Sequence, residues 1–234
     1  MNHQSTIEAQ IKCYKPQKII IASELYNERL AHIPEATFYK ALERMTKSAA
    51  LVRLAKGVYC IPKKTRFGIV RSSEQEIINY YTGTMGEYGV VVGYDLYRKY
   101  ALTTQISYKI EMYSNRIEAE QKRIGNVLIR RAQLQMTPAE RNMVEVFEIL
   151  EHYRQIENFN NVAFLRYIRM IAQNYDESAA LKVQRVLQYK KRTIAFMTMI
   201  LDNFNVCHNL RKMLSGTSKY KIPTMEEIYE AAQR

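Results

Sequence analysis

The fold of this chain is decided by residues 33–61, which read IPEATFYKALERMTKSAALVRLAKGVYCI. A helix is expected from Pro34 to Ala49, because proline is favoured in the first helical turn, where its missing N–H has no intrahelical partner to lose. Apolar side chains recur on one face of this helix at helical spacing; they are Phe38, Leu42, Met45 and Ala49. The opposite face presents hydrogen-bond donors and cations, namely Thr37, Lys40, Arg44 and Lys47.

Two short β-prone runs follow the helix directly. They cover residues 50–54 and 58–61, and Ala55-Lys56-Gly57 forms the turn between them. Arg53 and Lys56 flank the turn. A helix with outward-facing donors beside a basic hairpin is typical of a winged helix-turn-helix.

The residues before this stretch complete the pattern of a small domain. Ser5-Thr-Ile-Glu8 is a capping box that predicts a helix to about Tyr14. A β-prone start at Lys18 and a second helix near 22–27 follow. Residues 62–68 contain Pro62 and Gly68 and are interpreted as a junction. We therefore expect a winged helix-turn-helix DNA-binding domain over residues 1–68.

Residues 69–234 are expected to form a larger α/β domain with a helical C-terminal part, so the predicted fold class is α+β. Strands are predicted at 90–92, 109–114 and 126–132, and helices at 73–81 and 94–100. Thr137-Pro-Ala-Glu140 is a second capping box that predicts a helix as far as Ile156. Helical segments follow at about 161–174, 178–188, 192–204, 209–214 and 224–232.

The positive charge is concentrated near the N-terminus. The net charge of +12 divides into +8 over residues 1–71, with 13 Lys and Arg against 5 Asp and Glu, and +4 over residues 72–234. This asymmetry indicates a polyanionic partner. No apolar run approaches the ~20 residues of a membrane span. The three cysteines are scattered, so a cytoplasmic location without disulfides is expected.

The chain resembles the AbiEi-type abortive-infection antitoxins, which are bacterial transcriptional regulators of type IV toxin–antitoxin systems. The resemblance covers roughly residues 5–150. It is carried by the following segments: Leu42-Glu-Arg-Met, Leu51-Val-Arg-Leu-Ala-Lys-Gly-Val-Tyr, Pro62-Lys-Lys-Thr-Arg-Phe-Gly68, Gly93-Tyr-Asp-Leu-Tyr-Arg-Lys-Tyr-Ala-Leu-Thr-Thr-Gln, Lys109-Ile-Glu-Met-Tyr-Ser-Asn115 and Thr137-Pro-Ala-Glu140. It implies a repressor of its own operon and a neighbouring gene for a nucleotidyltransferase-like toxin, countered without a stable direct complex.

The expected roles in DNA binding divide the basic residues into two groups. Thr37, Lys40 and Arg44 are spaced to face one groove, where a good bidentate base contact is worth about 1–3 kcal/mol of discrimination. Phosphate or minor-groove contacts are expected of Lys47, Arg53, Lys56, Lys63, Lys64 and Arg66. If four to six of these contacts form, log K should fall with log salt with a slope of roughly −4 to −5.

Other functions remain open from the sequence. Asp95, Lys109 and Glu111 loosely resemble a metal-dependent nuclease cluster, but a pair of metal-binding carboxylates at useful spacing is missing. Cys207-His208 lacks further ligands. We expect no catalytic residue, cofactor or metal. A protein-interaction module that uses the winged helix for docking is the third interpretation, and the sequence does not indicate an oligomeric state.

Overall fold

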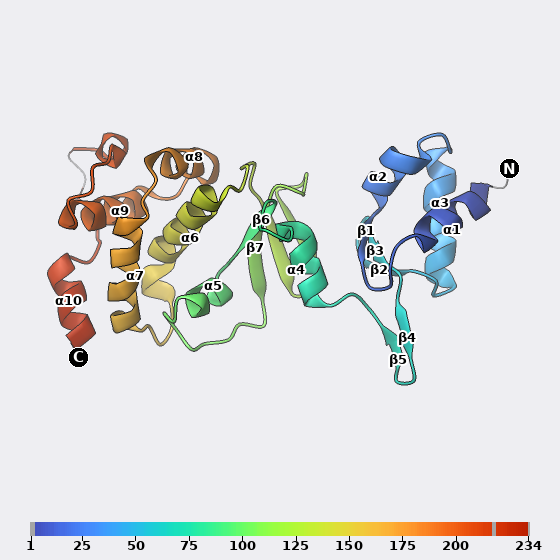
Figure 1. The fold of residues 1–234 in the computed structure, drawn as a ribbon, viewed down its shortest axis with the longest axis horizontal. Coiled ribbons are helices and arrows are strands. Elements are labelled where there is room, and N and C mark those ends of the chain that lie inside the picture. Colours follow the sequence, from blue (N-terminus) through green and yellow to red (C-terminus); the bar gives the residue numbers. More distant parts are fainter. Residues whose placement is uncertain (1–2, 217–218, 234) are drawn as a thin grey trace. The chain divides into compact units, whose positions relative to one another are not determined.

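The computed structural model describes residues 3–216 and 219–233. The chain is a mixed α+β protein in which about half of the residues are helical and the strands form several small sheets (Figure 1). It divides into two compact units. Unit 1 contains residues 1–80 and 123–127, and unit 2 contains residues 81–122 and 128–234.

Unit 1 begins with two helical segments and a short strand between them. These are α1 (His3–Lys12), β1 (Ile19–Ile21) and α2 (Ala22–Leu25), which continues into a π-helical turn, η1 (Tyr26–Leu30). The capping box was expected to open the first helix at Ser5, but α1 already includes His3, so Ser5 lies inside the helix and does not cap it.

The decisive stretch forms a helix and a hairpin, as predicted, but the helix ends at Lys47 rather than Ala49, whose φ of +56° is not helical. The helix α3 (Glu35–Lys47) is followed by β2 (Val52–Ala55) and β3 (Val58–Cys60). β3 pairs antiparallel with both β1 and β2, which gives a three-stranded sheet of order β1-β3-β2. The core of unit 1 is built from the helices, from β1 and β3, and from the segment before β2; it includes Ile7, Ile11, Ile20, Leu25, Leu30, Phe38, Leu42, Leu51 and Tyr59.

The segment interpreted as a junction is instead a second β-hairpin. Its strands are β4 (Lys63–Thr65) and β5 (Gly68–Val70), paired antiparallel in the register Lys63↔Val70. We call it the basic hairpin. Figure 1 shows it extending from the end of β3. The sequence prediction missed it because its strands have three residues each and no buried face.

The helix that follows is shared between the two units. α4 (Glu74–Thr82) begins in unit 1, where Lys18 pairs with Glu76 at 2.7 Å and the Tyr80 hydroxyl donates to Glu24 at 2.6 Å. Unit 1 therefore extends to Tyr80, whereas the sequence had placed the domain boundary at Gly68. The ion pair and the hydroxyl contact, which join residues far apart in the chain, explain the difference.

Unit 2 contains most of a four-stranded sheet of order β6-β7-β9-β8. The strands are β6 (Gly89–Val92), β7 (Ile110–Ser114), β8 (Gln121–Ile124) and β9 (Val127–Arg131), and α5 (Tyr94–Lys99) lies between the first two. The three predicted strands are present. β8 was not predicted, because its polar sequence Gln-Lys-Arg carries no β-strand pattern.

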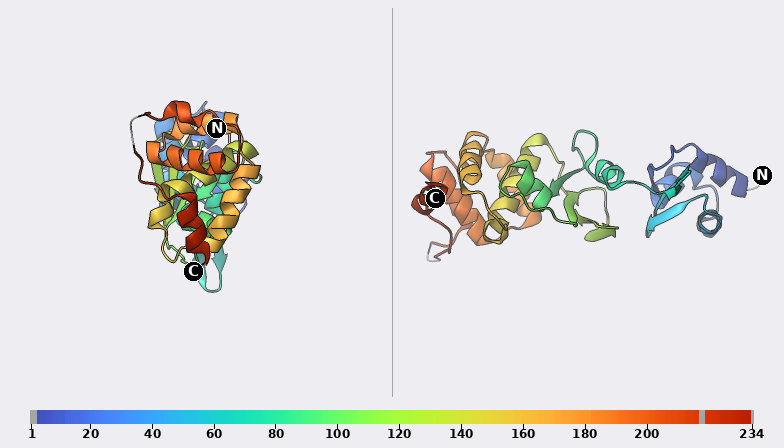
Figure 2. Two further views of the ribbon diagram at one scale, coloured as in Figure 1. Left: turned by 90° about the vertical axis from the view of Figure 1, so that its left-hand side faces the viewer. Right: turned by 90° about the horizontal axis from the view of Figure 1, so that it is seen from below.

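The remainder of unit 2 is helical, as predicted. The helices are α6 (Pro138–His152), α7 (Asn161–Gln173), α8 (Glu177–Leu187), α9 (Lys191–Asn203) and α10 (Met225–Gln233), with 3₁₀ turns η2 (Tyr153–Gln155) and η3 (Leu210–Met213). α6 packs against α8 and α9, and α10 packs against α7 (Figure 2). The capping box at Thr137 and Glu140 is formed, but α6 ends at His152 rather than Ile156. Across the described residues, no helix has both the length and the apolar character of a membrane span.

Candidate nucleic-acid interface

The outer face of α3 carries the four side chains predicted for DNA contact. Phe38, Ala41, Leu42 and Met45 are buried on the inner face. Thr37, Lys40, Arg44 and Lys47 are all exposed on the other side of the helix. At 100° per residue, Lys40 and Lys47 lie opposite the buried face, while Thr37 and Arg44 lie on one flank of it. α3 therefore presents two cations outward and two donors to the side.

Two of these four side chains already have a partner within unit 1. The Arg44 guanidinium donates to the Gln4 side-chain oxygen of α1 at 2.8 Å. The Lys47 ammonium pairs with Glu43 at 2.6 Å, one helical turn away. The hydrogen bond from Lys47 also holds the pKa of Glu43 below its ordinary value. Arg44 is thus oriented beside α1, and the charge of Lys47 is balanced, which leaves Lys40 as the central cation on this face.

Four further residues of α3 are exposed and were not predicted to contact DNA: Glu35, Ala36, Tyr39 and Glu43. Glu43 places a carboxylate on the outer face. Its spacing of four residues from Lys47 is the sequence signal that predicts an ion pair between the two. Tyr39 is 40% exposed, and its ring lies edge-on to Phe38 with centroids 5.2 Å apart. Partial burial and the nearby Glu35 raise the pKa of Tyr39. Its phenol is therefore a neutral donor at physiological pH.

The turn between β2 and β3 presents its cations to solvent. Arg53 and Lys56 are exposed, and Arg53 Nε donates to the Ala55 carbonyl at 3.4 Å. Gly57 adopts a φ of +71°, which a glycine tolerates without strain. Its carbonyl accepts a hydrogen bond from the Ala22 N–H at 2.9 Å. The turn is therefore tied to the start of α2 while its charged side chains remain outside.

The basic hairpin holds the other predicted cations, Lys63, Lys64 and Arg66, all exposed. Among the described residues, Lys47 is the one predicted cation with a carboxylate at ion-pair distance. A sequence signal for this was available: residues 44–73 contain eight Lys and Arg and no Asp or Glu. Because free cations release counterions when they meet phosphates, such a surface favours a polyanion.

Two of the three residues considered for a nuclease, Lys109 and Glu111, line a cleft of about 270 Å³ in unit 2, and Asp95 is not among its lining residues. Glu111 pairs with Lys109 and, at 2.9 Å, with Arg130. Burial raises the pKa of Glu111, but the hydrogen bond from Lys109 and the charge of Arg130 outweigh it, and the net shift is downward. Asp95 pairs with Arg98 at 3.3 Å. Both carboxylates therefore form ion pairs with neighbouring cations.

The other carboxyl that lines the cleft is Glu148, which accepts hydrogen bonds from the Tyr113 and Tyr189 hydroxyls at 3.1 and 2.9 Å. Burial raises the pKa of Glu148. His208 lies 3.0 Å from Asp202, and the neighbouring Cys207 is exposed. Within the described part of the chain, no group of three or more His, Cys, Asp or Glu side chains is placed to hold a metal ion.

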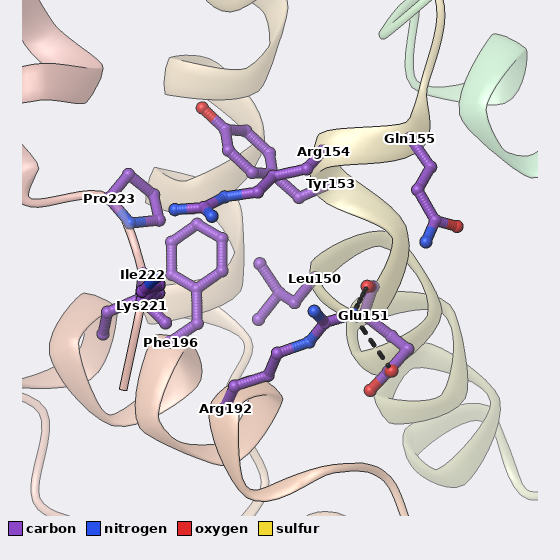
Figure 3. Close-up of a pocket in the computed structure, with 10 residues that line it drawn as sticks. All are labelled: Leu150, Glu151, Tyr153, Arg154, Gln155, Arg192, Phe196, Lys221, Ile222 and Pro223. Carbon is purple, nitrogen blue, oxygen red and sulfur yellow. Dashed lines mark hydrogen bonds and ion pairs between the residues drawn. The ribbon is translucent and has the colours of Figure 1, made fainter. Parts of the chain in front are cut away.

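A further pocket of unit 2 is drawn in Figure 3, at the C-terminal end of α6. Its volume is about 50 Å³, far below the roughly 300 Å³ at which small-molecule sites begin. Glu151 lies on its wall and pairs with Lys190 at 2.8 Å and with Arg192 at 3.6 Å. The carboxylate of this pocket is therefore already engaged by cations.

Comparison with known proteins adds little to this geometry. No protein-family model matches the chain, and no curated protein matches it. Among solved structures, the crystal structure of the RV2827C protein from Mycobacterium tuberculosis is similar, with 8% sequence identity and a TM-score of 0.42. The match covers 88% of this chain and 78% of that one. At this level of likeness, any function must be argued from the residues themselves.

Proposed function

We propose that this protein is a DNA-binding transcriptional repressor that acts as the antitoxin of a toxin–antitoxin operon and represses its own promoter. The observation that carries the proposal is the outer face of α3, with Lys40 at its centre, in the same unit as an exposed cationic turn and a basic hairpin. Unit 1 thus combines one helix with donors and a surrounding set of cations, which is what duplex recognition needs.

The order of elements in unit 1 supports a winged helix-turn-helix. Two helical segments, α2 with η1 and then α3, follow one another over the short connection 31–34. The hairpin β2–β3 follows α3, and the earlier strand β1 pairs with β3. In a helix-turn-helix the second helix of the pair lies in the major groove, and α3 is the second helix of this pair.

The proposed mechanism is occlusion of the promoter. Lys40 and Arg44 donate to the guanine edge in the major groove, and Thr37 contacts a base or a phosphate nearby. To contact a base, Arg44 must give up its hydrogen bond to Gln4 and donate to the base instead. Both acceptors are neutral. Phosphates are held by Lys47, Arg53, Lys56, Lys63, Lys64 and Arg66, and these contacts supply affinity rather than sequence choice.

The antitoxin part of the proposal is supported by the AbiEi-like segments of the sequence. Several of them, from Gly93 to Glu140, lie in unit 2, so unit 2 is proposed to carry the antitoxin activity in the cytoplasm. The functional partner is then a nucleotidyltransferase-like toxin from the adjacent gene. No catalysis is proposed, because Glu111 and Asp95 are engaged by cations.

The test is fluorescence anisotropy of the purified protein with a duplex from upstream of its own gene, beside a scrambled duplex of equal length and composition. We expect tight binding with a clear preference for the upstream duplex and a salt slope of roughly −4 to −5. Equal, weak and salt-insensitive binding to both would overturn the proposal and leave unit 1 as a protein-docking module. Cleavage of either duplex on addition of Mg²⁺, lost in Glu111→Ala, would favour the nuclease.

A further inference from the structure

The tip of the basic hairpin exposes a large aromatic side chain. Phe67 is 86% exposed, the highest value among the large apolar side chains of the described residues. It is one of two residues in the turn between β4 and β5, beside Arg66. The positive φ of this turn, +115°, falls on Gly68, so the backbone at position 67 does not require a particular side chain. Turn formation therefore does not explain a phenylalanine at this position.

The hairpin is anchored at its base and free at its tip. The Gln17 N–H donates to the Ile61 carbonyl at 2.7 Å, and the Gln17 side chain donates to the Arg71 carbonyl at 3.0 Å. The Ser72 hydroxyl donates to the Gln17 carbonyl. Gln17 thus ties both ends of the hairpin to unit 1, so the position of Phe67 follows that of unit 1.

The strands themselves leave apolar surface uncovered. Ile69 and Val70 are 53% and 42% exposed, and every residue from Lys63 to Val70 is exposed. An isolated two-stranded hairpin is marginally stable in water. Exposed apolar side chains gathered in one element indicate a contact site.

The charges around the tip define the kind of partner. Lys63, Lys64, Arg66 and Arg71 are exposed, and the residues from Arg44 to Ser73 include no carboxylate. The Arg66 guanidinium carbon lies 4.7 Å from the centre of the Phe67 ring, so a cation accompanies the aromatic side chain. The partner must offer negative charge at the sides and an apolar, stackable surface in the middle. Duplex DNA offers phosphates on both sides of a groove and base-pair faces within it.

We propose that Phe67 is an apolar wedge that enters the DNA minor groove and inserts at a base step, while Arg66, Lys63 and Lys64 bind the flanking phosphates. The proposal rests on the DNA-binding function proposed above and adds a second point of contact to α3. Insertion of an apolar side chain partly unstacks two base pairs, and cations beside the wedge are a recurring feature of minor-groove binders.

The test measures both the affinity for DNA and the unstacking of individual bases. The upstream duplex is prepared with 2-aminopurine replacing one adenine at a time, because the fluorescence of this base rises when it unstacks. Wild-type protein should raise the signal at one step, or at two adjacent ones. Phe67→Ala should abolish the rise and weaken binding by about fivefold to a hundredfold, with the salt slope unchanged because no cation is removed. Phe67→Leu should keep much of the rise.

The matched control is Tyr108→Ala, which removes an aromatic side chain of unit 2 that is 82% exposed, and it should change neither readout. Tight binding of wild-type protein without a fluorescence rise at any position would overturn the wedge and leave the DNA-binding function standing. Wild-type affinity in Phe67→Ala would also overturn it. Absence of binding to any duplex contradicts the proposed function itself. Binding to vesicles containing phosphatidylserine, without DNA binding and lost in Phe67→Ala, would assign the tip to a membrane surface.

Discussion

The cations around α6 in unit 2 and those of the β2–β3 turn and basic hairpin in unit 1 differ in their carboxylate partners. In unit 2, carboxylates of α6 with little exposure engage cations from neighbouring elements: Glu145 engages Lys99 at 2.7 Å, Glu140 engages Lys182 at 3.4 Å, and Glu151 engages Lys190 at 2.8 Å. In unit 1, the cations of the β2–β3 turn and of the basic hairpin have no such partner among the described residues.

The difference shows that net charge alone does not identify a binding surface. A cation paired with a carboxylate of low exposure helps to hold helices together and has little attraction left for a phosphate. An exposed cation without a carboxylate keeps its counterions until a polyanion displaces them. Unit 1, with its cluster of cations free of carboxylates, is therefore the part of the molecule we expect to bind DNA, whereas the ion pairs of α6 stabilise unit 2.

The largest expected effect comes from removing the free cations of unit 1. Alanine at Arg53, Lys56, Lys63 and Lys64 together should lower affinity for upstream and scrambled duplexes alike, by about 10³-fold at 0.1 M salt, and flatten the salt slope by about 3 to 4. The matched control removes four exposed cations of unit 2: Arg166, Arg169, Arg185 and Lys212. An equal loss of affinity in the control would show that the two units do not differ.

The converse change breaks a charge contact of unit 2. Glu145 accepts from the Tyr100 hydroxyl at 2.5 Å as well as from Lys99. Glu145→Ala leaves both donors without this partner, and should lower the free energy of unfolding by about 2–3 kcal/mol in urea titrations. Glu145→Gln should recover part of the loss. DNA affinity of the folded protein should not change; a large loss of DNA affinity would contradict the division of roles.

Acid should affect unit 2 more than unit 1. Burial raises the pKa of Glu111, Glu140 and Glu151, but hydrogen bonds from their partners outweigh it, so each pKa is lowered. A lowered folded pKa contributes stability that is present above the unfolded value of about 4 and is lost as pH falls through the folded value. Glu148 acts in the opposite sense, because burial raises its pKa.

We expect unit 2 to lose stability as the pH falls below about 4, where Glu111, Glu140 and Glu151 become protonated. Amide NMR spectra should show signals of α6 to α9 disappearing before those of α3. Simultaneous loss of both sets, or earlier loss of α3, would contradict the comparison.

The smallest effect concerns Glu43, the carboxylate on the outer face of α3. Glu43→Gln removes a negative charge beside the proposed DNA and frees Lys47 from its ion pair. Affinity for both duplexes should rise a few-fold in anisotropy titrations, and the melting temperature should hardly change, because an exposed ion pair at this spacing adds little to stability. Weaker binding would indicate that Glu43 itself contacts a base.

Local patterns in the sequence predicted much of this structure. The apolar spacing of Phe38, Leu42 and Met45 located α3, and the Thr137–Glu140 capping box located the start of α6. Each of these signals consists of residues that are close together in the sequence. All nine predicted contact residues are exposed in unit 1, although their role in DNA binding is a proposal.

The features that the sequence did not predict are those without a local apolar pattern and those that depend on contacts between distant residues. β8 and the basic hairpin have no apolar alternation, because their strands are short, polar or exposed. The extension of unit 1 to Tyr80 depends on Glu24 and Lys18, which are more than fifty residues away from their partners. The orientation of Arg44 depends likewise on Gln4.

The most direct test of the central claim is whether sequence preference resides in α3. The double variant Lys40→Ala, Arg44→Ala is compared with wild-type protein and with Arg166→Ala, Arg169→Ala, which removes two exposed cations from α7 of unit 2. Anisotropy is measured on upstream and scrambled duplexes, and circular dichroism checks the fold. We predict that the α3 variant binds both duplexes equally, while the α7 control keeps the wild-type preference. Retention of that preference by the α3 variant would contradict the account.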